Sequence, residues 1–204
     1  MISIKNLVKT SSFVLVLTLL LSGSVFAKTP MGVTSHIRVV TEDNTQAIAL
    51  YIPETDAPKV SIKIKNDAND VLFEKRAKVE NGYARKLDLS GLKDGRYHLI
   101  ITDEIKVVNQ AFQIANGEVL MSKSDRFTFT RPIVQYNPAR QLMQVVAFTD
   151  KDIEVNVFNA NGENIIQEKG AQPSEVYNLS VLRKGDYTVE VLCEGERFFQ
   201  TIQL

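Results

Sequence analysis

The chain has 204 residues, and its 24 Lys and Arg balance 24 Asp and Glu, so the formal net charge at pH 7 is zero. A nucleic-acid-binding protein or a polybasic membrane-surface protein normally carries a basic excess, so the balance argues against both classes. The hydrophobic fraction of 44% is sufficient for a folded core, and the length allows one domain or two.

The first 27 residues contain the three parts of a secretory signal peptide. Lys5 and Lys9 give a basic start, an apolar run covers residues 13–21, and small side chains precede a cleavage point after Ala27. The run is well below the ~20 residues that a membrane-spanning helix needs, so we expect no stable membrane span. We therefore expect residues 1–27 to be removed and the chain to be exported to the periplasm, the cell surface or the extracellular space. A retained N-terminal anchor is the alternative.

Loss of this leader changes the charge only slightly, because it removes two Lys and no acidic residue and leaves 22 basic against 24 acidic, or minus two. No Cys lies near the cleavage point, so lipid attachment has no acceptor. Cys193 is the single Cys, which excludes an intramolecular disulfide. Its position after the apolar run 187–192 indicates a small buried hydrophobic residue rather than a reactive thiol.

The most informative feature is an internal repeat. Residues 89–114 align on residues 179–204 without a gap at an offset of 90, and residues 60–64 align on 153–157 at an offset of 93. Two copies of about 85 residues are each large enough to close a core of their own. We therefore expect two domains, one over residues 28–116 and one over residues 124–204.

Alternation of apolar and polar residues, the period of half-buried strands, dominates both copies. In the first copy it predicts strands at 37–39, 48–52, 60–64, 71–73, 85–89, 97–101 and 107–114. In the second it predicts strands at 127–129, 143–148, 153–158, 163–166, 176–179, 187–192 and 198–204. Turn-forming residues separate these segments, at 66–70 and 159–162 for example. Seven short strands per copy and no helical stripe after the leader predict an all-β chain of two tandem immunoglobulin-like antiparallel β-sandwich domains.

One motif occurs in both copies and predicts a structural role. A strand ends at a Leu, a turn containing Gly follows, and a Tyr opens the next strand, which is the pattern of a tyrosine corner. In such a corner the phenol bonds to backbone a few residues upstream, and the Gly supplies a positive φ. The residues are Leu89, Gly95, Tyr97, Leu179, Gly185 and Tyr187.

Residues 133–204 resemble the C-terminal sorting domain of the type IX secretion system, which is found in secreted proteins of Bacteroidetes. The residues that carry the resemblance are Tyr136-Asn-Pro138, the turn at 159–162, the corner at 179–187 and a final strand at 198–204. The resemblance implies an immunoglobulin-like exported module and, for this segment, recognition by the secretion machinery. Residues 60–114 match the same pattern more loosely.

Residues for catalysis or metal binding do not cluster in the sequence. The two His, His36 and His98, are far apart, and Asp67, Asn69 and Asp70 lack the glycine and distal Glu of a calcium loop. No nucleophile elbow or nucleotide-binding loop is present, so we predict no catalytic residues, no cofactor and no metal. Enzyme activity would need a deep pocket that joins His36 or His98 to acidic residues.

These observations favour a non-catalytic exported protein, a binding or structural module of two sandwiches. Its partner would be a protein, reached through exposed sheet edges. The competing hypothesis is that residues 133–204 form a type IX sorting signal. The sequence indicates neither a ligand nor an oligomeric state.

Overall fold

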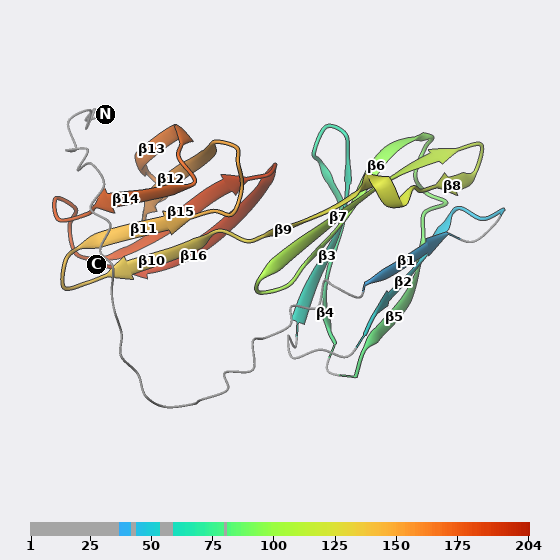
Figure 1. Cartoon of the computed structure of the whole chain (residues 1–204), viewed down its shortest axis with the longest axis horizontal. Coiled ribbons are helices and arrows are strands. Elements are labelled where there is room, and N and C mark those ends of the chain that lie inside the picture. Colours follow the sequence, from blue (N-terminus) through green and yellow to red (C-terminus); the bar gives the residue numbers. More distant parts are fainter. Residues whose placement is uncertain (1–36, 42–43, 54–58, 80) are drawn as a thin grey trace.

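The computed structural model describes residues 37–41, 44–53, 59–79 and 81–204, and the expected signal peptide and His36 lie outside these residues (Figure 1). Strands occupy most of the described chain, and no helix in it is long and apolar enough to cross a membrane. The strands are β1 (Arg38–Thr41), β2 (Ala47–Ile52), β3 (Lys59–Asn66), β4 (Val71–Lys78), β5 (Tyr83–Asp88), β6 (Gly95–Thr102), β7 (Lys106–Ala115), β8 (Glu118–Leu120), β9 (Arg126–Thr130), β10 (Ile133–Asn137), β11 (Leu142–Val146), β12 (Ile153–Asn159), β13 (Asn164–Ala171), β14 (Ser174–Asn178), β15 (Asp186–Cys193) and β16 (Glu196–Gln203). A short 3₁₀ helix, η2 (Lys123–Asp125), precedes β9.

The strands form two sandwiches with the same strand order. In the first sandwich the sheet β1-β2-β5 packs on β4-β3-β6-β7, and in the second the sheet β10-β11-β14 packs on β13-β12-β15-β16. Counted from β1 and from β10, both sandwiches therefore pair strands 1-2-5 and strands 4-3-6-7. All strand pairs are antiparallel. The predicted fold of two tandem immunoglobulin-like β-sandwiches is confirmed.

Each sandwich has its own hydrophobic core, built from the inward residues of both its sheets. In the first core Leu50 of β2 packs with Ile62 of β3 and Leu99 of β6. In the second core Met143 of β11 packs with Val155 of β12. These side chains are almost completely buried, as the period-two alternation predicts. The exact domain boundaries at residues 28–116 and 124–204 stay a prediction.

One predicted strand pairs differently from the expectation. The sequence places Phe127–Phe129 in the second copy, but β9 pairs with β7 of the first sandwich, with Val107 opposite Phe129. The sequence predicts neither β8 nor β10. β8 pairs with the other end of β7, and β10, not 127–129, is the first strand of the second sandwich and pairs with β11. β8 and β9 come from residues 118–130, which have no counterpart in the repeat. Figure 1 shows β9 continuing from the first sandwich directly toward β10 of the second.

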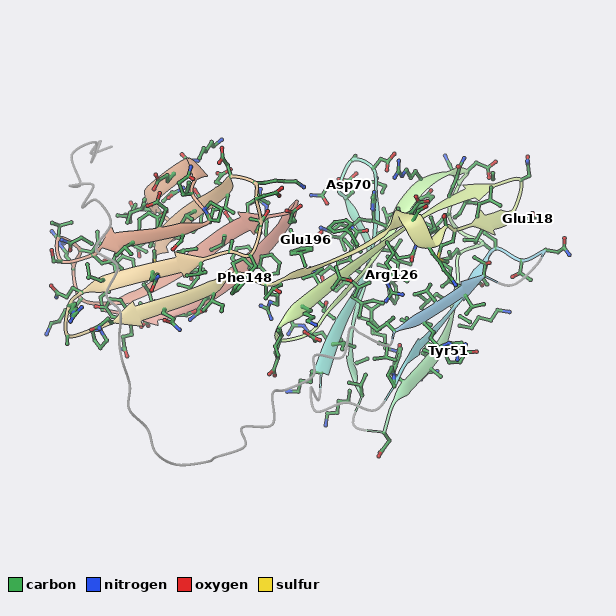
Figure 2. All side chains as sticks on the ribbon, viewed as in Figure 1. Tyr51, Asp70, Glu118, Arg126, Phe148 and Glu196 are labelled. Carbon is green, nitrogen blue, oxygen red and sulfur yellow. The ribbon has the colours of Figure 1, made fainter. Side chains whose placement is uncertain are left out.

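The two sandwiches touch where β9 leaves the first and the β15–β16 hairpin of the second begins. Lys65 on β3 forms an ion pair of 2.6 Å with Glu196 on β16. The Phe129 ring contacts the Phe198 ring edge-on at 6.2 Å between centroids, and the Arg131 guanidinium lies 5.4 Å from the Phe198 centroid. These contacts hold the start of β16 against the first sandwich and leave the rest of the strand pointing away from it (Figure 2).

Candidate functional site

The six residues that the sequence singles out lie at equivalent places in the two sandwiches. Tyr97 donates its hydroxyl proton to the carbonyl of Lys93 at 2.8 Å, and Tyr187 donates to the carbonyl of Arg183 at 2.9 Å. Both rings are buried in their cores. Each bond spans four residues and closes the turn before strand 6, which is the contact that a tyrosine corner makes.

The leucines and glycines of the motif frame these turns. The amide of Leu89 bonds the carbonyl of Gln46 at 2.9 Å, and the amide of Leu179 bonds that of Gln141 at 2.8 Å. Each leucine is buried and ties strand 5 to the loop before strand 2. Gly95 and Gly185 have φ of +159° and +156°, positive values that residues with a side chain rarely adopt, as the motif predicts. No feature of these turns is chemically reactive.

Of the residues weighed for metal binding or catalysis, those that the structure describes lie at the surface of the first sandwich. His98 Nε2 lies 3.5 Å from the Asp67 carboxylate and its Nδ1 lies 3.1 Å from the Asn109 amide oxygen. Asn69 and Asp70 form a hairpin turn in which Asn66 bonds to Asp70. The residues the structure describes contain no group of three or more His, Cys, Asp or Glu that could hold a metal ion. His98 lines neither of the two grooves of about 870 and 650 Å³ on the first sandwich.

Cys193 is buried, as its sequence neighbours predict. Burial, reinforced by the adjacent Glu194 carboxylate, raises the pKa of its thiol to about 11. The thiol is therefore protonated at neutral pH and a poor nucleophile.

The feature best suited to binding is the outer edge of β16. The amide and carbonyl of Leu204 both bond to Gly185, which makes these two residues a hydrogen-bonded pair. Because such pairs alternate along an antiparallel ladder, the amides and carbonyls of Arg197, Phe199, Thr201 and Gln203 point away from β15. Among the described residues β15 is the only strand that pairs with β16. We call these outward backbone groups the β16 edge.

In the first sandwich the equivalent edge, on β7, is covered by other strands. With the offset of 90, the outward groups of β7 are those of Val107, Asn109, Ala111 and Gln113. β9 pairs with Val107 and Asn109, and β8 pairs with Gln113. In the gap between these strands the Gln110 side chain donates to the Ala111 carbonyl at 3.0 Å and to the Ser122 carbonyl at 2.9 Å. The segment 118–130 therefore covers β7 along most of its length.

The equivalent side chains of the two edges differ in their exposure to solvent. Val107, Gln110 and Ala111 are buried, whereas Arg197, Gln200 and Thr201 at the equivalent positions are exposed. Asn109 is half-buried, and its equivalent Phe199 is 60% exposed. The β16 edge is thus a strand surface that the same fold covers in its other copy.

Beyond Arg197, the β16 edge also lacks the features by which outer strands avoid pairing. Charges, prolines and bulges usually protect such strands. β4 carries Glu74, Lys75, Arg76 and Lys78, and β13 carries Glu168 and Lys169 and breaks its register at Gly170, whose φ of +72° favours glycine. Residues 198–203 of β16 read Phe-Phe-Gln-Thr-Ile-Gln, without charge, Pro or Gly.

Sequence reasoning named exposed sheet edges in general but did not single out this one. A signal was present in the repeat alignment, where Val107 and Ala111 correspond to Arg197 and Thr201. Replacement of apolar by polar residues at equivalent strand positions indicates that one of the two strands is uncovered. Which of the two strands is uncovered follows only from the order of the strands in the sheets, and the sequence does not give that order.

The fold is that of two tandem immunoglobulin-like β-sandwiches. No protein-family model matches the chain, and no curated protein matches it. Among solved structures, a biofilm-associated protein BSP domain aligns with 82% of this chain and 29% of its own at 12% identity and a TM-score of 0.28. The chicken CNTN1 FN1-FN3 domains align with 86% of this chain and 66% of their own at 11% identity and a TM-score of 0.26. The fold assignment therefore rests on the sheets and cores of this chain.

Proposed function

We propose that this chain is an exported, non-catalytic binding protein that takes up a β-strand of a protein partner at the β16 edge. The observation that carries the proposal is the contrast between β7, which β8 and β9 cover, and β16, which pairs only with β15 among the described residues. In the first sandwich, β9 pairs with β7 in the way that we propose for a partner strand on β16.

Strand addition uses backbone groups that are already aligned. The outward amides and carbonyls of Phe199 and Thr201 are fixed by the ladder to β15, so only the incoming strand loses conformational freedom. The exposed Phe199 ring supplies apolar area on the outer face of the sheet. Specificity would come from side chains of the partner that alternate across the two faces of the sheet.

Export is the second part of the proposal, and the leader at residues 1–27 supports it. Fractionation of cells that produce the chain tests it. Export predicts a protein that begins after Ala27 in the periplasm, on the surface or in the medium. Recovery of the intact chain with its leader in the cytoplasm would contradict export.

Photo-crosslinking from position 199 tests the binding edge directly. A photoreactive phenylalanine analogue placed at Phe199 in the full chain is expected to crosslink a strand segment of a bound protein. The same analogue at Val181, which is 66% exposed but lies in the turn after β14, is the matched control. Crosslinks must depend on the edge, so Thr201→Pro, which removes one outward amide, should abolish them. Absence of any Phe199-specific product would refute the edge as a binding site.

A second candidate function is that residues 133–204 act as a type IX sorting signal. The Tyr136-Asn-Pro138 start and the corner closed by Tyr187 support it. Fusion of residues 133–204 to an exported reporter tests it in a host that has the type IX machinery. A sorting signal moves the reporter across the outer membrane, and a reporter that stays in the periplasm would exclude this function.

A further inference from the structure

We infer that the strand taken up at the β16 edge is the β16 strand of a second copy of this chain, so that two second sandwiches form one continuous sheet. The inference rests on the proposed function and goes beyond it by naming the partner. Three properties of β16 support it: its free edge, the absence of charged residues over 198–203 and the match of the strand to itself.

The match of β16 to itself follows from which of its residues point their amides and carbonyls away from β15. If two β16 strands pair antiparallel about a two-fold axis at Gln200, Phe199 of one copy lies opposite Thr201 of the other, and Arg197 lies opposite Gln203. All four outward residues then form hydrogen-bonded pairs with outward residues of the second copy. The register therefore satisfies each free backbone group of the β16 edge.

Side chains favour the same register. Phe199 and Thr201 form an aromatic and β-branched cross-strand pair, which stabilises antiparallel sheets. Arg197 meets the neutral Gln203, so the two exposed arginines do not face each other. In the first sandwich the edge of β7 holds β9, which reads Arg-Phe-Thr-Phe-Thr, and β16 offers a comparable Arg197-Phe-Phe-Gln-Thr201. An isologous pair of this kind closes on itself and does not extend into a filament.

The contact involves one strand from each copy, so it buries less than the ~800 Å² per partner of a standard interface. The dimer is therefore expected to be weak and to dissociate on dilution. Sedimentation velocity of the purified chain over a dilution series should show a shift from monomer to dimer as concentration rises.

Substitutions at the edge separate this contact from other modes of association. Thr201→Pro removes an outward amide, and Thr201→Lys places like charges near the two-fold axis, so both should leave a monomer at every concentration. Thr188→Lys is the matched control, because Thr188 lies opposite Thr201 on β15, whose two edges are both paired. It should dimerise like the parent chain.

A cysteine scan tests the register. In this register the two Gln200 residues form a non-hydrogen-bonded pair with a Cα separation of about 4.5 Å, which a disulfide can bridge. Gln200→Cys should therefore form a crosslinked dimer under mild oxidation, and Cys193, being buried, does not compete. Two Gln203 residues would lie about 20 Å apart, so Gln203→Cys should remain uncrosslinked.

The outcomes distinguish this inference from the function on which it rests. Dimerisation lost in both Thr201 variants, with a disulfide at position 200 only, supports pairing of two copies. A monomer at every concentration, or equal crosslinking at positions 200 and 203, overturns it. If the monomer still gives a Phe199-specific crosslink to another protein, the partner is not a second copy and the proposed function stands. If no such crosslink forms either, both fail.

Discussion

The Lys65 ammonium lies 2.6 Å from the Glu196 carboxylate and joins β3 of the first sandwich to β16 of the second. The two side chains are only 8% and 12% exposed. A nearly buried ion pair between two separate cores fixes the start of β16, so it positions the β16 edge relative to the first sandwich.

Loss of one charge of this pair should destabilise the chain. Glu196→Gln leaves the Lys65 ammonium nearly buried without a counter-charge, and we expect the free energy of unfolding to fall by about 1–3 kcal/mol. The matched control is Glu74→Gln, which breaks the longer Lys63–Glu74 pair of 3.6 Å between more exposed side chains and should cost less than ~1 kcal/mol. Urea denaturation measures both. Equal losses of stability in the two variants would show that the Lys65–Glu196 pair contributes no more than the exposed Lys63–Glu74 pair.

Adjacent phenylalanines on β16 offer a sharper comparison. Phe198 packs on the second core and contacts Phe129 and Arg131 of the connecting segment, whereas Phe199 is exposed. We expect Phe198→Ala to cost about 2–4 kcal/mol, because it removes a half-buried ring, and Phe199→Ala to stay within about 0.5 kcal/mol. Thermal or urea unfolding of the two variants checks the contrast. A loss at Phe199 as large as that at Phe198 would argue against an exposed edge.

The tyrosine hydroxyls should make a modest and equal contribution in the two copies. Tyr97→Phe and Tyr187→Phe each remove one hydrogen bond to backbone, to Lys93 and Arg183, and should lower the free energy of unfolding by about 1 kcal/mol. Tyr51→Phe, at an exposed tyrosine of β2, is the control and should change it by less than ~0.5 kcal/mol. Unchanged stability in both corner variants would remove the structural role that we assign to the phenols.

Acid should weaken the β15–β16 hairpin through Glu194. Hydrogen bonds from Lys151 and then Thr149 hold the pKa of this carboxyl below its ordinary value of 4.5. A lowered folded-state pKa gives stability that is present above pH 4.5 and is lost as the pH falls through the folded-state value. Glu194→Gln should therefore lose less stability than the parent chain when the pH drops from about 5 to about 3. If the free energy of unfolding fell equally in the two proteins as the pH dropped, Glu194 would not contribute to the pH dependence.

Local pattern was enough to predict much of the fold. The period-two alternation identifies inward residues such as Leu99 and Val189, and the repeat shows that the same order of strands occurs twice. β8 and the partner of β9 could not be predicted, because segment 118–130 has no counterpart in the repeat and its alternation does not say which sheet it joins. The Lys65–Glu196 pair joins residues 131 positions apart, and no local signal connects them. The β16 edge likewise depends on sheet order, since an alternating strand has the same sequence pattern at an edge as inside a sheet.

Amide hydrogen exchange tests the open β16 edge most directly. In a solution dilute enough to hold monomers, the amides of Phe199 and Thr201 should exchange quickly, because they point to solvent. The amides of Val107 and Asn109, at the equivalent positions of β7, should exchange slowly because they bond to β9. Equal protection of the two pairs in the monomer would contradict the account, since the β16 edge would then be closed and unable to accept a strand.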